Sequence, residues 1–595
     1  MGSARDDPRA SGPPPCSQVD TATASASAPA DETEAAAPAD ETEAAAPADE
    51  TEAVAEAAAP AGERRPEAAA DAEAGGAAQP AYARPEGVGA MSIVFVASEC
   101  APYSKSGGLA DVMGSLPPAL AARGHRVMVV SPRYDAYEGA ADTGHRALIS
   151  KATGIEHDGE VGYFHESRDG VDYLFVDHVS FRRPGGMYGD KYGDYQDNQW
   201  RFKMLCLAAL EAPLQVELPG GRYGEEVVFV ANDWHAGLLP VYVAAHYRRY
   251  GTYASARTVF AIHNLRYQGV FSPFTYGELG LPWEWAGATE WQYPPHLRMG
   301  AYEEEGRCVN TIKGALATAD RIVTVSPTYA EEIQTPLGGF GLHEMLQGRH
   351  MMLEGLLNGI DMDEWDPAAD AHIPHPFSKD DLAGKAACKA ALQRELGLPE
   401  DPDVPLVAFI GRLDPQKGAD MVLGAAGWLA QEHGVQVVLL GSGDPGMEDE
   451  LRALEHEHKD RARAWVGFNV AFSHRLNAAA DILLMPSRFE PCGLNQMYAQ
   501  RYGTVPVVHA TGGLRDTVEQ AVPSAGTGTG WQFTDCTTDG LKACVWEVLQ
   551  TYWTDKEAWA KIVRNGMEKD FSWNKAAERY EMTMHWAKLD PPYCK

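Results

Sequence analysis

Short apolar runs alternate with helical patterns from Met91 onward, and this alternation constrains the fold more than any other feature. The runs are rich in Val and Ile and almost continuously apolar, which is typical of strands buried on both faces of a parallel sheet. In the first half they occupy residues 93–97, 127–130, 173–176, 227–230, 259–262 and 322–325. After a Pro- and Asp-rich linker (361–405), they resume at residues 406–410, 435–440, 482–485 and 505–508. The sequence therefore predicts an α/β chain with two doubly wound, Rossmann-like domains.

Residues 1–90 have a different composition. The unit Ala-Pro-Ala-Asp-Glu-Thr-Glu-Ala-Ala repeats there with a period of nine, and large apolar residues are nearly lacking. Such a segment cannot bury enough apolar surface to offset its ordering entropy, so we expect a disordered acidic extension. It is either a simple tether or a tail that docks on a partner.

The formal net charge of −34 argues against nucleic acid and anionic membranes as partners. No run of eighteen apolar residues predicts a membrane span. The nine cysteines form no CxxC pair and show no zinc spacing, so no metal site is expected. A transit peptide is not evident in the chain.

Two glycine pairs follow strand-like runs, one in each half. Lys105 precedes Gly107 and Gly108 at a predicted strand-to-helix turn, and a second Gly-Gly-Leu turn occupies 512–514. Glycines let backbone N–H groups approach a phosphate, and the start of a helix favours negative charge. The two turns therefore predict two domains that share a polyanionic ligand.

Basic and acidic residues follow two strands of the second half. Arg412 and Lys417 lie five residues apart after the run 406–410 and could neutralise a diphosphate leaving group. A surface pair of basic residues is the alternative. Glu490 precedes a Pro-Cys-Gly turn, where a carboxylate could bind sugar hydroxyls or stabilise an oxocarbenium ion.

Two further strands of the first half end in polar residues. His263 ends one of them and is either functional or a satisfied core histidine. Asp233, Trp234 and His235 end the strand before it, and this combination suits carbohydrate. Asp233 could instead cap the helix that follows.

Together these motifs resemble those of starch synthases and bacterial glycogen synthases, in order and spacing, over 91–595. The stretch 473–475 and the tail 586–593 resemble plant and algal soluble starch synthases of type I. The resemblance implies a GT-B fold with domains at 91–355 and 356–572 and a C-terminal helix, 573–595, that returns to the first domain. It implies retaining transfer of glucose from ADP-glucose to the non-reducing end of an α-1,4-glucan such as amylopectin or a short maltooligosaccharide. It also implies a plastid location, in chloroplast stroma or amyloplast, and no metal or other cofactor.

The resemblance also implies roles for individual residues. The implied catalytic residues are Lys105, His263, Arg412, Lys417 and Glu490. The implied donor site comprises Lys105, Gly107, Gly108, Asn358, Arg412, Gln416, Lys417, Glu490, Cys492, Gly493, Leu494, Gly512, Gly513 and Leu514. Glu99, Asp233, Trp234 and Asn264 are implied on the acceptor side. Closure of the two domains would join both halves of the donor site.

Other functions remain as alternatives. A glycogen synthase of the same family fits the same motifs, and a non-catalytic scaffold could bind glucan or other starch enzymes. A Rossmann oxidoreductase needs a GxGxxG turn that neither domain has. One hypothesis concerns Cys100 and Cys492: in a closed state they could form a disulfide that blocks turnover. Two independent buried thiols are the alternative.

Overall fold

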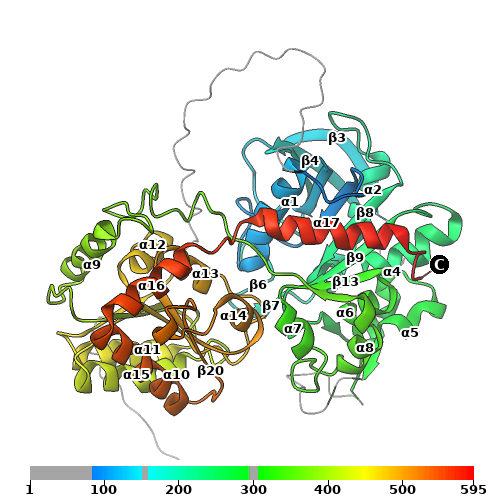
Figure 1. The fold of residues 1–595 in the computed structure, drawn as a ribbon. Helices are drawn as coiled ribbons and strands as arrows, with labels where there is room; N and C mark the ends of the chain where they lie inside the picture. The colour runs from blue at the N-terminus through cyan, green and yellow to red at the C-terminus, as the bar shows by residue number, and fades with distance from the viewer. Residues whose placement is uncertain (1–82, 150–158, 293, 295–305, 595) are drawn as a thin grey trace, which may run out of the picture. The chain divides into compact units, whose positions relative to one another are not determined.

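The computed structural model describes residues 83–149, 159–292, 294 and 306–594. The predicted disordered extension, 1–90, lies almost entirely outside these residues. Among the helices that the structure describes, none is both long and apolar enough to cross a bilayer. The described chain builds a nine-stranded sheet in its first half and a six-stranded sheet in its second, as the alternation of apolar runs predicts (Figure 1).

The first sheet is mostly parallel, and its strands follow the order β14-β13-β9-β8-β1-β2-β5-β4-β3. Their bounds are β1 (Ser92–Val96), β2 (Arg126–Pro132), β3 (Ala141–Leu148), β4 (Glu160–Arg168), β5 (Val171–Asp177), β8 (Val227–Asn232), β9 (Arg257–Ile262), β13 (Arg321–Thr324) and β14 (Leu353–Gly355). Only β4 and β3 run antiparallel to their neighbours, at one edge. The apolar runs did not predict this edge, because β3 is mostly exposed or half-buried.

The central strand β1 shows how the sheet is covered. It pairs in parallel with β2 and β8, so that Val94 lies opposite Met128 and Phe229. Its side chains alternate between two buried clusters, because successive residues of a strand point to opposite faces. One face packs on α1 and α17, and the other on α2 and α4. The bounds are α1 (Gly108–Ala122), α2 (Asn198–Gln215), α4 (Leu239–Tyr242) and α17 (Trp573–Leu589).

Shorter elements complete the first half. A three-stranded sheet and a hairpin lie outside the main sheet: β10 (Val270–Phe271), β11 (Glu290–Gln292) and β12 (Arg307–Asn310), and β6 (Gly189–Asp190) with β7 (Gly193–Asp194). The remaining α-helices described in this half are α3 (Asp233–Ala236), α5 (Ala286–Thr289), α6 (Thr311–Thr318), α7 (Pro327–Glu332) and α8 (His343–Gly348).

The second sheet is wholly parallel, in the order β17-β16-β15-β18-β19-β20. Its strands are β15 (Leu406–Ile410), β16 (Gln436–Gly441), β17 (Ala462–Val466), β18 (Ile482–Met485), β19 (Val505–His509) and β20 (Trp531–Phe533). Its helices are α10 (Ala419–Glu432), α11 (Pro445–Glu457), α12 (Val470–Ala479), α13 (Asn495–Arg501), α14 (Gly512–Thr517), α15 (Thr538–Thr554) and α16 (Lys556–Met567).

The predicted linker 361–405 is wrong in part, because residues Ala383–Glu395 form α9. Five of its thirteen residues are Ala and two are Lys, and both residue types favour helix. Lys385 anchors α9, since its half-buried side chain donates to the carbonyl oxygens of Ala478 (3.1 Å) and Ala480 (2.8 Å) at the end of α12.

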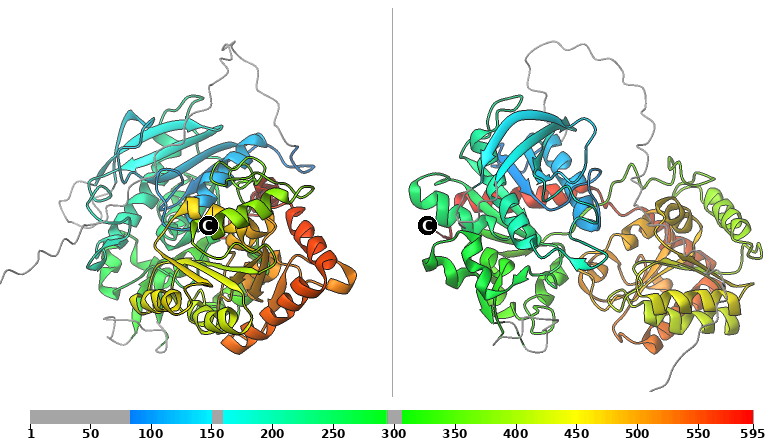
Figure 2. Two further views of the ribbon diagram at one scale, coloured as in Figure 1. Left: turned by 90° about the vertical axis from the view of Figure 1, so that its left-hand side faces the viewer. Right: turned by 180° about the vertical axis from the view of Figure 1, so that it is seen from behind.

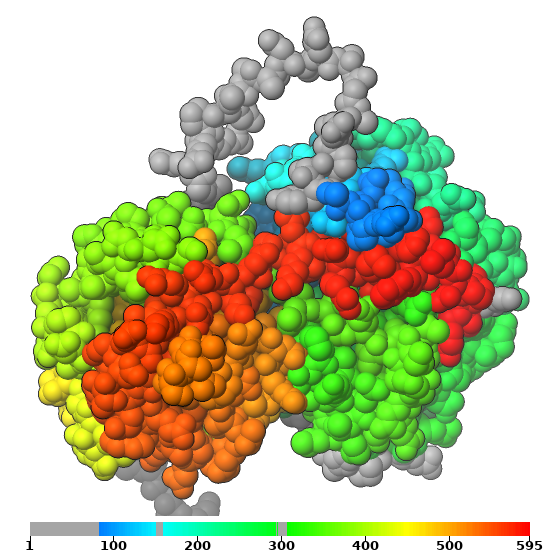
Figure 3. Space-filling model, viewed as in Figure 1, coloured from blue at the N-terminus to red at the C-terminus, as the bar shows by residue number. Residues whose placement is uncertain are grey.

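The last helix, α17, packs against α1 and the first sheet rather than against the second half (Figures 1 and 2). Tyr580 and Met584 are buried in the same cluster as Phe95. Glu581 contributes polar contacts, since its carboxylate accepts from His125 Nε2 and pairs with Arg123, both at 2.7 Å. In the space-filling view the helix lies on the surface of the first half, flanked by blue and green segments (Figure 3).

The chain passes between the halves twice, and the two passages lie side by side. Ile360 N donates to Phe571 O (2.8 Å), and Ile360 forms a parallel bridge with Ser572. A Cβ at Gly359 would lie 2.8 Å from Trp573 N, so glycine permits this close approach.

Candidate active site

The carboxyl ends of β15 and β18 bring Lys417 and Glu490 together. The Lys417 ammonium contacts Glu490 Oε2 at 2.6 Å, and Ser487 Oγ donates to the same oxygen at 3.1 Å. Glu490 is only 5% exposed, so a cationic partner offsets the cost of burying its carboxylate. Asn495 Nδ2 ties the two strand ends together by donating to Ile410 O at 2.9 Å.

Arg412 lies on the same turn as Lys417 but remains accessible. Its Nη2 contacts Asp414 Oδ2 at 3.2 Å and donates to Gln416 Oε1 at 3.3 Å. Asp414 also accepts from Lys417 N (2.8 Å), which closes the turn. The Arg412 side chain is 57% exposed, so this cation can meet a ligand at the edge of the sheet.

Gly512 and Gly513 pack against the turn that carries Glu490. A Cβ on Gly512 would lie 2.0 Å from Glu490 O, and one on Gly513 would lie 2.1 Å from Cys492 O. The Gly513 N–H donates to Glu490 O at 3.0 Å, and the Gly512 N–H donates to Glu332 Oε1 at 2.9 Å. In this structure the glycine pair therefore supports the Glu490 turn. Its contact with phosphate stays a prediction.

The first half also supports the Glu490 turn. Ser326 Oγ, at the start of α7, donates to Pro491 O at 2.6 Å. Burial raises the pKa of the Cys492 thiol to about 12, and neighbouring Asn358 lowers it. A Cβ on Gly108 would lie 3.9 Å from Leu494 Cδ1, so the glycine turn of α1 lies next to the residues that follow Glu490.

Glu99 holds the loop that contains Lys105. Its Oε2 accepts from the backbone N–H groups of Ser106 and Gly107, and its Oε1 accepts from Ser106 Oγ. Burial raises the pKa of Glu99, while the hydrogen bonds to Ser106 lower it. The implied acceptor-side residue Glu99 thus positions the donor loop in this structure. Lys105 itself is half exposed and pairs with Asp111 at 2.6 Å.

Asn232 fixes the tautomer of His263. The Asn232 amide donates to Val96 O (3.1 Å) and Val230 O (3.0 Å), so its Oδ1 accepts from His263 Nε2, 2.9 Å away. Desolvation lowers the pKa of His263 to about 4, so the imidazole is neutral. With Nε2 protonated, Nδ1 is left as a hydrogen-bond acceptor.

Asp233 fixes the backbone at His263. Its Oδ1 accepts from His263 N at 2.7 Å and from Asn264 N at 3.4 Å. Desolvation raises the pKa of Asp233 to about 7, and these two hydrogen bonds lower it. The alternative that Asp233 caps a helix is therefore wrong: it is the first residue of α3, and its carboxylate points to the next strand end. Its φ of +52° is left-handed, which Asp tolerates better than most residues.

The ring of Trp234 packs against aromatic neighbours. It lies 4.0 Å from His235 and 5.1 Å from Phe202, measured between ring centroids. Its role in contacting carbohydrate stays a prediction.

Cys100 and Cys492 are both buried and both free. The Cys100 thiol donates to Ala101 O and Met113 O at 3.6 Å, and burial raises its pKa. Because burial keeps both thiols protonated, little thiolate is present and disulfide formation is slow. The proposed disulfide stays a prediction.

Two residues that orient this site were assigned no role from the sequence. Asn232 precedes Asp233 in the same motif, but nothing in the sequence shows that it orients His263. Tyr188, in a loop, donates from its hydroxyl to Glu99 Oε1 at 3.0 Å.

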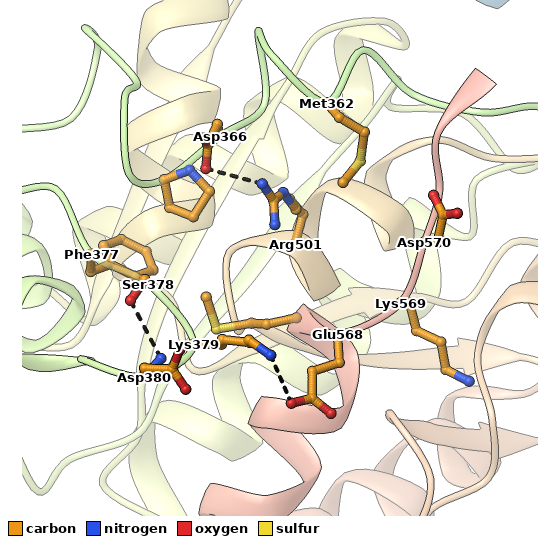
Figure 4. A pocket seen from close by; sticks show the side chains of 12 residues that line it. Met362, Asp366, Phe377, Ser378, Lys379, Asp380, Arg501, Glu568, Lys569 and Asp570 are labelled. Carbon is orange, nitrogen blue, oxygen red and sulfur yellow. Dashed lines mark hydrogen bonds and ion pairs between the residues drawn. The ribbon is translucent and has the colours of Figure 1, made fainter. Parts of the chain in front are cut away.

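A cavity of about 760 Å³ lies apart from the predicted site residues, beside the passages between the halves. Four of its charged lining residues form two pairs: Asp366 with Arg501 at 3.0 Å, and Lys379 with Glu568 at 3.1 Å (Figure 4). None of the residues predicted for the donor or acceptor lines it.

Comparison with known proteins identifies the family. The starch synthase catalytic domain family matches residues 92–348, and glycosyl transferases group 1 matches residues 392–566. Soluble starch synthase 1, chloroplastic/amyloplastic, from Solanum tuberosum is 53% identical over 515 residues, which cover 85% of this chain and 80% of the relative. The chain belongs to the starch synthase family. Starch synthase 1 from Arabidopsis thaliana is 52% identical and covers 84% of this chain and 78% of its own.

Solved structures confirm the predicted GT-B fold of this starch synthase family member. The catalytic domain of starch synthase IV from Arabidopsis thaliana, bound to ADP and acarbose, has a TM-score of 0.72 and 33% identity. The match covers 84% of this chain and 100% of the starch synthase IV chain. Sucrose-phosphate synthase from Thermosynechococcus elongatus, 17% identical with a TM-score of 0.51, shares the fold.

Proposed function

We propose that this starch synthase family member transfers glucose from ADP-glucose to the non-reducing end of an α-1,4-glucan, with retention of configuration, in a plastid. The observation that carries the proposal is the group of Arg412, Lys417 and Glu490 at the carboxyl edge of β15 and β18. The 53% identical relative is named a chloroplastic/amyloplastic soluble starch synthase, and the structure 33% identical to this chain holds ADP and acarbose.

The two cations suit a diphosphate leaving group. Arg412 offers a half-exposed guanidinium, and Lys417 an ammonium on the same turn. As the bond to the anomeric carbon breaks, negative charge grows on the ADP phosphate, and fixed cations stabilise it. Glu490, next to Lys417, would accept hydrogen bonds from the glucose hydroxyls.

His263 and Asp233 suit the transferred glucose. Neutral His263 presents Nδ1 as an acceptor for a sugar hydroxyl, and Asp233 fixes the backbone whose carbonyl would face the anomeric carbon. The acceptor hydroxyl would attack from the face that ADP leaves, and a phosphate oxygen of ADP would take its proton. A hydrolase of this type would need two opposed carboxylates instead.

The proposal includes no metal. Arg412 and Lys417 would supply the positive charge that a divalent cation supplies in other transferases. Transfer should therefore continue at an unchanged rate in EDTA.

Parallel assays with labelled ADP-glucose and UDP-glucose, on amylopectin, glycogen and a maltooligosaccharide, test the function. We expect incorporation from ADP-glucose, and digestion by a β-amylase should release the label, as new α-1,4 ends require. Incorporation from neither donor would overturn the proposal and favour a glucan-binding scaffold. Faster transfer to glycogen than to amylopectin would favour a glycogen synthase.

A further inference from the structure

Arg201, near the start of α2, is one of the largest fully buried side chains of the described chain. Its Nε donates to Ser180 O at 3.0 Å, and its Nη1 donates to Met187 O at 3.0 Å and Asn198 Oδ1 at 2.6 Å. These three acceptors are neutral, and desolvation lowers the pKa of the guanidinium. The rings of Phe181, Tyr195 and Phe202 lie 5.1–5.5 Å from the guanidinium carbon and offset part of the cost of burying this cation. What its hydrogen bonds hold in place is therefore of interest.

The contacts of Arg201 converge on the backbone of Tyr188. One route is direct, because Met187 O belongs to the peptide group that also contains Tyr188 N. The second passes through Asn198: Arg201 binds its Oδ1, which directs Nδ2 toward Tyr188 O, 2.8 Å away. A planar guanidinium can hold both acceptors at fixed angles.

Tyr188 connects Arg201 to the donor loop through its ring and its hydroxyl. Its ring stacks on His235 at 4.9 Å, and its hydroxyl lies 3.0 Å from Glu99 Oε1. Glu99 in turn accepts hydrogen bonds from Ser106 and Gly107, directly after Lys105. A continuous series of contacts therefore joins α2 to residues 105–108.

We propose that Arg201 is a positioning residue for the donor: through Tyr188 and Glu99 it holds the loop 105–108 in the arrangement that binds ADP-glucose. The inference rests on the proposed function of that loop. Arg201 is buried behind the loop 180–188, so it acts on the donor only through these neighbours.

The test compares Arg201→Met with Arg349→Met. Arg349 is a matched control, because it is 6% exposed and donates to the carbonyl oxygens of Leu316 and Ala319. Both variants should lower the melting temperature. Only Arg201→Met should raise KM for ADP-glucose, by about tenfold, the effect of losing one well-made hydrogen bond. A normal KM in folded Arg201→Met would overturn the inference.

Tyr188→Phe keeps the ring and removes the hydroxyl, so it tests the pathway even where Arg201→Met folds poorly. Tyr188→Phe should raise KM for ADP-glucose and leave KM for the glucan acceptor unchanged. Combined with Arg201→Met it should add little, whereas with Arg349→Met the effects should multiply. If the fold-increases in KM of Arg201→Met and Tyr188→Phe multiply in the double variant, Arg201 does not act through Tyr188. Inactive wild-type protein would instead refute the proposed function, which keeps the two failures distinct.

Discussion

The imidazole of His263 donates from Nε2 to the amide oxygen of Asn232, 2.9 Å away. The side-chain amide of Asn232 is fixed in this orientation, because its own N–H groups donate to Val96 O and Val230 O of β1 and β8. The backbone of the first sheet thus sets which nitrogen of His263 accepts a hydrogen bond.

Replacing Asn232 by Asp should make activity sensitive to acid. A carboxylate beside Nε2 favours the imidazolium, so the pKa of His263 should rise by roughly 1–3 from its value of about 4. Protonated His263 loses its acceptor at Nδ1. The acidic limb of kcat/KM against pH should therefore move upward in Asn232→Asp. Asn310→Asp, at a helix N-cap elsewhere in the first half, should leave the profile unchanged. An unshifted limb in Asn232→Asp would contradict this role.

Asp233→Asn should change how stability depends on pH. Between about pH 4 and 7, native Asp233 keeps a proton that the unfolded chain has released, so its contribution to the free energy of unfolding falls as pH rises. His263 has the opposite effect between about pH 4 and 6.5, because only the unfolded chain binds its proton. In Asp233→Asn, the slope of the free energy of unfolding against pH should therefore be more positive than in the wild type, by about 1.4 kcal/mol per pH unit. Urea unfolding between pH 5 and 6.5 measures it, and a slope equal to wild type would exclude the assigned protonation.

Lys417→Ala should lower kcat by about 10²–10³, because one fixed cation at the leaving group is lost. It should also lower the melting temperature, since Glu490 would be left buried with no cation. Lys561→Ala, which breaks an exposed ion pair with Glu557, is the control and should change neither quantity.

The double variant Lys417→Ala with Glu490→Gln separates the two effects. Neutralising Glu490 should restore most of the lost stability but none of the lost turnover. Recovery of kcat together with melting temperature would mean that Lys417 only supports the fold.

Gly512→Ala and Gly513→Ala should each reduce activity and stability together. Their methyl groups would overlap Glu490 O and Cys492 O, at 2.0 and 2.1 Å, and so displace the Glu490 turn. Gly348→Ala, in α8 with open space around its Cβ, should be neutral or slightly stabilising. Normal kinetics in both Gly512→Ala and Gly513→Ala would contradict the packing role.

The apolar runs predicted the parallel strands because strands buried on both faces need apolar residues at every position. β3 was not predictable in this way, since one face of it meets solvent. The helix α9 was hidden by the Pro and Asp residues around it.

The same limit applies to the site. Lys417 and Glu490 could be placed at one sheet edge, because both follow buried strands. That Glu99 holds the Lys105 loop, or that Gly512 packs on Glu490, depends on contacts between distant segments that no local pattern encodes. Tyr188 gave no signal because its loop has no periodicity.

The position of α17 has a consequence for biosynthesis. Tyr580 and Met584 complete a hydrophobic cluster whose other members include β1, made about 480 residues earlier. At ribosomal speeds, roughly 25–100 s separate the two ends of that cluster. Until α17 emerges, the face of the first sheet that α1 and α17 share is covered by α1 alone on the nascent chain. A ribosome that stops short of residue 573 would therefore release a chain whose first half, not its last, is unfinished.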